Sequence, residues 1–499
     1  RVFLDGVELP YLYHFQQYAS VVHSRLLEEL AIYPSAFGAS WGDAVGGVAA
    51  VRTRRPDPVR THGGVNLNTI TGGAWVQAPL RGGRAVSLSG RRSFADLFDS
   101  SNDQYTSWPV FWDYMGGAEQ RLDSGGRLGL TLLGAGDSYG RYVGDTGLLD
   151  PVGRDQAPDF RFSRAFHGAI ASSELNGATS SHQSTLGLTH DRWGGELTGG
   201  MQDRRALQTV ARHTSRFLVT DWLSVATGGD GTVNTVQRDV QVDQAWLELA
   251  AEVPLMAHGV DIQDQWSRVR GGVWVEPQVK LGPVELQPGL RLQGDSLVQA
   301  SAVEPRIGAE ADLGESVQLH AAGGRHTQAP EVDAIARATD ALDLIDSWQA
   351  VAGVNWAVAG RWELGVEGWG RTLTGAVVDK AGAPVQTVSG QAGGVELTTR
   401  YRLRDLFFAY ASVSLARSVR GGAPADYDQP LIVNLVGSWD FAEGWNAGLR
   451  YRYASGLPYS PLDGLYSADT DTWAPVPKAP NAARLPDYQK VDVHLERAW

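Results

Sequence analysis

The sequence predicts an all-β membrane protein, an antiparallel transmembrane β-barrel, on three observations. From about Gly63 onward, the 499-residue chain becomes a series of segments in which apolar and polar side chains alternate. Each segment has about the ten residues that a tilted membrane-spanning strand needs. Short turns alternate along the chain with longer polar stretches, as they do in outer-membrane barrels.

The segment from Trp445 to Tyr453 shows the alternation clearly. Trp445, Ala447, Leu449, Tyr451 and Tyr453 fall on one face, and polar or small residues stand between them. This pattern is typical of a strand with one apolar and one polar face. Similar alternation runs through residues 128–132, 284–293, 361–367, 395–404 and 431–440. We count about twenty such strands in the chain.

Turn residues divide these strands into hairpins. Residues 80–84, 123–126 and 442–444 are short and rich in glycine or charge, which predicts tight turns at one end of the barrel. We interpret the longer polar stretches as extracellular loops: Asp137 to Phe162, Arg205 to Asp239, Gln328 to Ser347, Val419 to Gln429 and Gly456 to Pro486. The helical spacing of Ile335, Ala338 and Leu342 predicts a short helix within Asp333 to Leu344.

A soluble all-β protein such as a propeller would also show alternation. The sequence has no repeat of fixed period that would mark propeller blades. Aromatic residues stand at strand ends, as with Trp362, Trp439 and Trp445, where the interfacial girdles of a membrane barrel lie. Both observations favour the barrel.

The amino-acid composition argues against several classes of protein. The chain carries 43 Lys+Arg against 56 Asp+Glu, a net charge of -13, so a nucleic-acid-binding surface is not expected. No run of about 20 apolar residues is present, which excludes a helical membrane protein. With 0 Cys there is no disulfide framework and no thiolate metal site.

Residues 1–56 differ from the alternating region. Val2 to Val7 predicts a short strand with a turn, and Leu26, Leu27 and Leu30 are spaced for one face of an amphipathic helix. A glycine-punctuated run follows from Tyr33 to Pro56. We therefore expect a small, compact α/β unit at the start of the chain.

This N-terminal unit resembles the second half of the plug domain of TonB-dependent outer-membrane receptors. The resemblance rests on a DGV strand, a Leu/Ile-rich segment and a pattern of WG, Ala, GGV and a basic stretch ending in proline. The plug-motif residues in this sequence are Asp5, Gly6, Gly42, Gly46, Gly47, Arg52 and Arg54. Weaker similarity continues through the barrel, as in Ala321 to Pro330 and Arg450 to Tyr459.

The resemblance implies a plug of residues 1–57, partial and placed in the lumen, and a barrel of residues 58–499. It implies an outer-membrane receptor for energised nutrient uptake, whose partners are outer-membrane lipid, a small extracellular ligand and a TonB-type protein that contacts a segment upstream of Arg1. We expect lumen-facing Glu396, Arg400 and Arg402 to provide polar partners for the basic plug residues, including Arg55.

Barrels of this family close with 22 strands in the complete protein. In the family, a motif like Asp487 to Asp492 usually precedes the last strands. An unclosed barrel would leave strand edges unpaired in lipid. We therefore expect the barrel to lack its last strands in this sequence.

Residues 10–18 are the candidate ligand platform, because the corresponding plug loop of the family rises toward the extracellular side. Tyr11, Tyr13, His14, Gln16 and Gln17 provide contact area and hydrogen bonds for a ligand. The same rings would serve equally well to pack the plug against the barrel wall. The ligand class stays open among siderophore, carbohydrate, vitamin and peptide.

Two classes of function remain. The first is the uptake receptor, and the second is a non-transport barrel that acts as an adhesin or an assembly scaffold. We expect no enzyme, because no catalytic constellation is present, and no metal or cofactor, because the histidines show no ligand spacing. A plug favours the receptor, since a scaffold needs no folded obstruction in its lumen.

Overall fold

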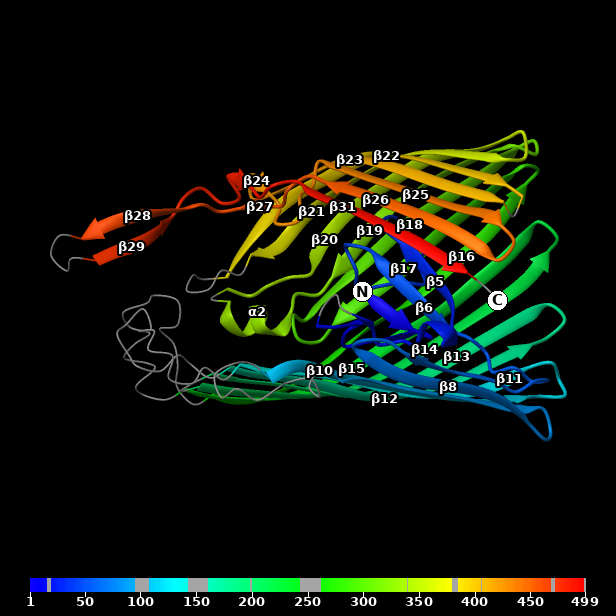
Figure 1. Cartoon of the computed structure of the whole chain (residues 1–499), viewed down its shortest axis with the longest axis horizontal. Coiled ribbons are helices and arrows are strands. Elements are labelled where there is room, and N and C mark those ends of the chain that lie inside the picture. The colour runs from blue at the N-terminus through cyan, green and yellow to red at the C-terminus, as the bar shows by residue number, and fades with distance from the viewer. Residues whose placement is uncertain are drawn as a thin grey trace.

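The computed structural model is a closed β-barrel with a small sheet inside it (Figure 1). It describes residues 1–15, 19–94, 107–141, 160–197, 200–242, 262–338, 340–378, 385–404, 406–467 and 472–497. About twenty antiparallel strands form the barrel, as the alternation predicts. Within these residues, no helix is both long and apolar enough to cross a membrane.

The barrel strands follow one another around the wall in chain order, and the last strand lies next to the first. Their bounds are β7 His62–Leu67, β8 Thr71–Leu80, β9 Arg84–Ser93, β10 Ser107–Arg121, β11 Arg127–Arg141, β12 Phe160–Asn176, β13 Ser180–Leu197, β14 Gly200–Thr220, β15 Leu223–Val242, β16 Ile262–Leu281, β17 Val284–Asp295, β18 Ala300–Leu313, β19 Val317–Gln328, β20 Ile345–Val358, β21 Trp362–Val378, β22 Gln386–Leu403, β23 Phe407–Arg420, β24 Ala423–Pro424, β25 Leu431–Ala442, β26 Trp445–Ala454 and β31 Tyr488–Arg497.

The two ends of the barrel differ. One end, here the turn end, carries tight connections such as residues 122–126, 221–222 and 282–283. The other, the loop end, carries the long connections, which hold α2 Val332–Arg337, β27 Pro458–Tyr459, β28 Leu462–Ser467, β29 Thr472–Pro477 and β30 Ala483–Arg484. Figure 1 places α2, β28 and β29 at this loop end, opposite the tight turns. The short helix expected after Asp333 thus exists, although it starts one residue earlier and is only 6 residues long.

The plug is a 4-stranded sheet in the order β2-β1-β6-β5, with β1 and β6 parallel. Its strands are β1 Val2–Leu4, β2 Val7–Glu8, β5 Leu27–Tyr33 and β6 Val48–Thr53, and a separate hairpin pairs β3 Tyr13–His14 with β4 Ala19–Ser20. The predicted boundary between residues 57 and 58 falls in the connection from β6 to β7. Whether further strands follow Trp499 stays a prediction, while the described strands already close the barrel.

The helix predicted around Leu26, Leu27 and Leu30 is wrong. Ser24–Leu26 forms one 3₁₀ turn, η1, and Leu27–Tyr33 is β5. The reason is pairing with β6, in which Leu30 lies opposite Val51, so the segment alternates between two faces. Leu26 is buried in the plug core, whereas Leu30 is 45% exposed.

The loop predicted from Arg205 to Asp239 is also wrong. Strands β14 and β15 run through this stretch and leave only residues 221–222 as a turn. Polar side chains on both faces of β14 concealed its alternation. The loop expected from Asp137 to Phe162 lies largely outside the described residues, and the other three predicted loops lie at the loop end.

The core lies where plug and wall meet. Leu4, Val7 and Leu26 of the plug pack with inward residues of the wall, among them Met115 and Phe166. The outer wall is apolar, with exposed residues such as Leu449 and Val493. The fold therefore hides one apolar surface inside the lumen and presents another to lipid.

The outward face of β26 offers a test of membrane insertion. Leu449→Arg should cost about 2 to 4 kcal/mol of unfolding free energy in lipid vesicles, because it places a cation in hydrocarbon. Gly448→Arg, one residue away on the lumen face, is the matched control and should cost less. An equal cost for the two variants would contradict the assignment of the faces.

Candidate functional site

Inward side chains from β9 to β20 hold the plug in the lumen. The most extensively held segment is the connection from β5 to β6, residues 34–47, which we call the clamped loop. Gln349 accepts from the amide of Ala36 at 2.9 Å and donates to the carbonyl of Val45 at 2.9 Å. Glu276 accepts from the amide of Ala39 at 2.6 Å. Backbone groups of the loop thus find their partners on the wall.

Arg306 on β18 is the centre of this clamp. Its Nη1 donates to the carbonyls of Gly38 and Trp41 at 2.6 and 2.7 Å. Its Nη2 lies 2.7 Å from the carboxylate of Glu304, which is fully buried. One arginine therefore neutralises a buried carboxylate and fixes the turn of the clamped loop.

Gly42 illustrates how tightly the loop meets the wall. A Cβ atom at this position would lie 2.2 Å from Nε of Arg291, which is fully buried. Only glycine permits this approach. The plug-motif glycines differ in this respect, because Gly46 faces open space, while Gly6 is needed for its φ of +88°.

A second contact holds the hairpin of β3 and β4, here the apex hairpin. Nδ1 of His14 lies 2.5 Å from Asp137 on β11, and Nε2 lies 3.2 Å from Asp113 on β10. The ring stacks on Phe111 at 4.3 Å. Arg91 on β9 pairs with Asp113 at 2.7 Å and donates to the carbonyl of Ser20. Both strands of the apex hairpin are thus tied to the wall.

The protonation state of His14 decides the charge of this buried cluster. Burial lowers the pKa of His14, but the hydrogen bonds with Asp113 and Asp137 and their charges outweigh it and raise the pKa above its ordinary value. The positive imidazole then balances two carboxylates together with Arg91. The cluster is a salt bridge between plug and barrel.

The predicted ligand residues lie near the apex but have different surroundings. His14 is fully buried, so its role is attachment of the hairpin. Tyr13 is 43% exposed. The guanidinium carbon of Arg164 lies 4.1 Å from the ring centroid of Tyr11. The Tyr11 and Phe166 rings pack edge to face, with their centroids 5.0 Å apart. Gln16 and Gln17 lie outside the described residues.

The hydroxyl of Tyr11 is buried and has no hydrogen-bond partner within the described part of the chain. Burial and the nearby Asp137 raise the pKa of Tyr11 well above its usual range, so the hydroxyl keeps its proton. An unused buried donor is costly unless a ligand or water accepts from it. Among the predicted residues that the structure describes, Tyr13 therefore offers exposed surface at the apex, whereas Tyr11 holds a buried hydroxyl without a partner.

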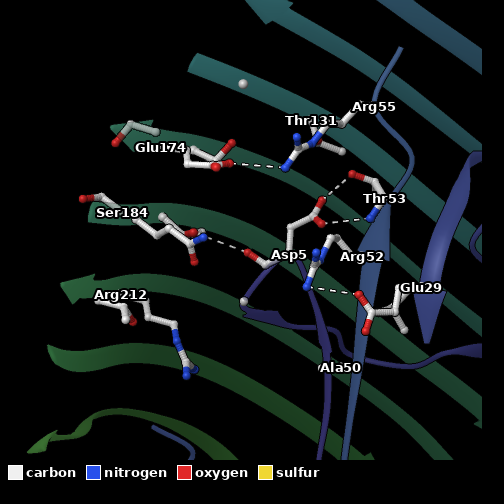
Figure 2. Close-up of a pocket in the computed structure, with 18 of the residues that line it drawn as sticks. Asp5, Glu29, Ala50, Arg52, Thr53, Arg55, Thr131, Glu174, Ser184 and Arg212 are labelled. Atoms are coloured by element: carbon white, nitrogen blue, oxygen red, sulfur yellow. Dashed lines mark hydrogen bonds and ion pairs between the residues drawn. The ribbon is translucent and has the colours of Figure 1, made fainter. Parts of the chain in front are cut away.

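A cavity of about 430 Å³ lies between the plug sheet and the barrel wall (Figure 2). Its plug side includes Asp5, Arg52 and Arg55, and its wall side includes Glu174 and Arg212. Glu174 stands two residues before the end of β12, so the cavity lies toward the turn end. Both acidic and basic side chains line the cavity, so its surface is polar.

Ion pairs and hydrogen bonds line the cavity, as Figure 2 shows. Arg55 pairs with Glu174 at 3.3 Å. Asp5 accepts from the amide and hydroxyl of Thr53 at 2.9 and 2.7 Å. Burial raises the pKa of Asp5 despite these hydrogen bonds. Of these contacts, the Arg55–Glu174 pair links the plug to the barrel wall, so a plug that moves would have to break it.

The expected partners of the basic plug residues are wrong. Arg52 pairs with Glu29 of the plug at 3.1 Å, and Arg55 pairs with Glu174. Arg400 instead pairs with Glu363 on the neighbouring strand at 2.6 Å. The physical reason is that the described plug contacts the wall from β9 to β20, whereas Glu396, Arg400 and Arg402 lie on β22.

Sequence reasoning missed the wall residues that hold the plug. A signal for Arg270 and Arg306 was present, because each stands two positions after another charged residue, Arg268 or Glu304, on the same strand. Such spacing places both side chains on the same face of the strand, and paired charges are expected on the lumen face because the other face meets lipid. Their partners in the plug could not be read from the sequence.

The chain is similar to outer-membrane transporters. Residues 52–499 match the family model described as TonB dependent receptor-like, beta-barrel. The FrpB iron transporter from Neisseria meningitidis (F3-3 variant) is similar with a TM-score of 0.70 and 14% identity, over 100% of this chain and 84% of that one. The outer membrane transporter YddB from Escherichia coli gives 0.70 and 12%, over 99% and 83%.

A mutant of the ferric enterobactin receptor PfeA from Pseudomonas aeruginosa gives a TM-score of 0.67 and 13% identity, over 99% of this chain and 82% of that one. At these identities the likeness is one of fold. No curated protein matches the sequence. The family model covers most of the chain, and the structure shows the barrel and the lumen plug, so the chain belongs to the TonB-dependent receptor family.

Proposed function

We propose that this protein is an outer-membrane receptor that takes up a scarce extracellular nutrient through rearrangement of its plug. The observation that carries the proposal is a folded plug held across the lumen, with an apex hairpin toward the loop end and a polar cavity toward the turn end. Family membership and the similar transporters support an outer-membrane uptake function.

The arrangement assigns a role to each part. A ligand arriving at the loop end meets Tyr13, which is exposed at the apex. The clamped loop anchors one side of the plug to the wall, and the cavity offers space on another side. A TonB-type partner in the periplasm would supply the energy to rearrange the polar contacts around the cavity. An adhesin or scaffold needs neither a plug nor such a cavity.

A ferric siderophore is the ligand class that we propose to test first. Several of the similar structures are named as iron or siderophore transporters. The apex also offers suitable chemistry, because the exposed ring of Tyr13 can pack on the flat groups of a chelate and its hydroxyl can donate a hydrogen bond. Carbohydrate, vitamin and peptide ligands are the comparison arms.

Tyr13→Ala should weaken ligand binding by about 1 to 3 kcal/mol, because it removes exposed aromatic area and a hydroxyl from the apex. The measurement is the Kd for each ligand class, together with the yield of folded barrel. Tyr401→Ala is the control, since Tyr401 packs on Trp362 at 4.6 Å near the turn end. It should leave the Kd unchanged.

Uptake separates a receptor from a binding scaffold. Cells that express the protein should accumulate the bound ligand only while the inner membrane is energised. Binding without energised accumulation, in cells that hold a TonB-type protein, would contradict the uptake role. Unaltered affinity of Tyr13→Ala would contradict only the assignment of the apex.

A further inference from the structure

The outer wall of the barrel carries a group of polar side chains on β12 to β14. Ser173, His182, Ser184, His213 and Ser215 form this group, which we call the polar island. Cross-strand pairing places His182 opposite Ser215, and Ser184 opposite both His213 and Ser173. All five lie on the outward face, because the alternate position Gly187 on β13 meets Val7 of the plug.

Four members of the island, His182, Ser184, His213 and Ser215, form a connected hydrogen-bond network. Nδ1 of His182 lies 2.8 Å from Oγ of Ser215, and Nδ1 of His213 lies 2.8 Å from Oγ of Ser184. Nε2 of His213 lies 2.8 Å from Oγ of Ser215. Two neutral imidazoles and two hydroxyls carry one donor each, and these three hydrogen bonds use three of the four donors. A donor therefore remains for a group outside the network.

Apolar residues flank the island along the same strands. Toward the turn end lie Leu175, 44% exposed, and Phe217. Toward the loop end lie Leu186 and Leu188, which are 56% and 49% exposed. The polar island thus interrupts the apolar band, where lipid tails offer no hydrogen-bond partner. Uncovered polar groups at this depth cost free energy, so the position favours a covered surface.

The outer wall beside the polar island has a hollow. Small residues stand next to it, among them Ala211, Gly229 and Gly231, and they form a hollow of about 660 Å³. Leu186, which is 56% exposed, stands among them and pairs across the strands with Ala171 and Ala211. A protruding leucine and a hollow of small residues therefore lie side by side at nearly the same depth.

The protruding leucine, the hollow and the hydrogen-bonding groups of one copy can fit those of a second copy in the same membrane. A symmetric dimer of two copies inserted in the same direction has its two-fold axis along the membrane normal, which brings equal depths together. With that axis between β13 and β14, Leu186 of each copy meets Ala211 and the hollow of the other. Ser184 likewise meets His213, and both can donate or accept. The island carries no obligatory charge, so the contact brings no like-charge repulsion.

We propose that the polar island and its hollow form an interface with a second copy of this chain in the membrane. The partner is chosen by the complementarity of ridge and hollow and of the hydrogen-bonding groups at matched depth. Polar side chains that find each other across a lipid-embedded interface stabilise association. The dimer would leave the lumen and plug of each barrel unobstructed.

Cysteine cross-linking in native outer membranes tests the interface, and the chain provides a clean background with 0 Cys. Two differently tagged copies are expressed together, one with Leu186→Cys and the other with Ala211→Cys. Oxidation should produce a covalent species that carries both tags, at least about tenfold above the control. The control replaces Leu186→Cys with Leu397→Cys, which is 46% exposed on β22.

A second arm adds Ser184→Ala and His213→Leu to both copies. If the island meets a second copy, cross-linking should fall on the order of tenfold, because the interfacial hydrogen bonds are lost. Folded yield is checked separately. Equal cross-linking of the 186/211 pair and the control pair would overturn the proposal. So would a photo-cross-linker at Leu186 that captures only lipid or only a different protein.

Discussion

Arg306→Ala should release the clamped loop from the barrel wall. The variant removes the donor to the carbonyls of Gly38 and Trp41 and leaves the buried carboxylate of Glu304 without its closest cation. Breaking a buried pair in this way costs about 3 to 5 kcal/mol. Hydrogen exchange of residues 34–47 should accelerate by at least about 100-fold, since 1.4 kcal/mol corresponds to tenfold.

The matched control is Arg400→Ala. Arg400 and Glu363 form an ion pair of 2.6 Å whose side chains are 50% and 62% exposed, and such pairs contribute about 1 kcal/mol or less. Exchange in residues 34–47 should be unchanged in this variant. If Arg306→Ala exchanged as slowly as the wild type, the clamp would have to reside in Gln349 and Glu276 instead.

The barrel was largely predictable from the sequence, because strand alternation is a local property. The segment of β26 shows it, since each outward residue from Trp445 to Tyr453 is apolar or aromatic. Short glycine-rich turns gave the second signal, and the structure places them at one end. Strand alternation and glycine-rich turns can both be recognised from neighbouring residues, without knowledge of contacts between distant parts of the chain.

The two wrong predictions of secondary structure have different causes. Leu27 to Tyr33 was expected in a helix, but pairing with β6 makes it a strand. Residues 205–239 were expected as a loop, because β14 carries polar side chains such as His213 and Ser215 where a lipid-facing strand should be apolar. These outward polar residues belong to the polar island. A lipid-facing strand that departs from the apolar pattern in this way indicates a surface with an additional role.

The candidate site was predictable only in position. The aromatic segment around Tyr11 and Tyr13 is at the plug apex, as the family resemblance implied. Sequence could not show that His14 would be buried between Asp113 and Asp137, because these residues lie 99 and 123 positions away. Such contacts depend on the closure of the barrel around the plug.

His14 should make attachment of the apex hairpin dependent on pH. The groups that face it are Asp113 and Asp137 on the wall, with Arg91 beside Asp113. Because the pKa of His14 is raised in the folded protein, its stabilising contribution is fully present below the unfolded pKa of about 6.5. The contribution is lost as the pH rises through the folded pKa, when two carboxylates share one arginine.

In His14→Gln, the apex hairpin should be loosely attached at every pH. The attachment should lose about 3 kcal/mol of free energy, because Asp113 and Asp137 lose the imidazolium between them. A fluorophore attached through Ala19→Cys on β4 reports the change as quenching by a soluble quencher. In the wild-type background, quenching should rise as the pH is raised above about 6.5 and through the raised pKa of His14, while in His14→Gln it should be high and flat. A pH transition that persists in His14→Gln would assign the titration to another group. A transition that disappears while the barrel stays folded would identify the imidazole as the proton-dependent link between plug and wall.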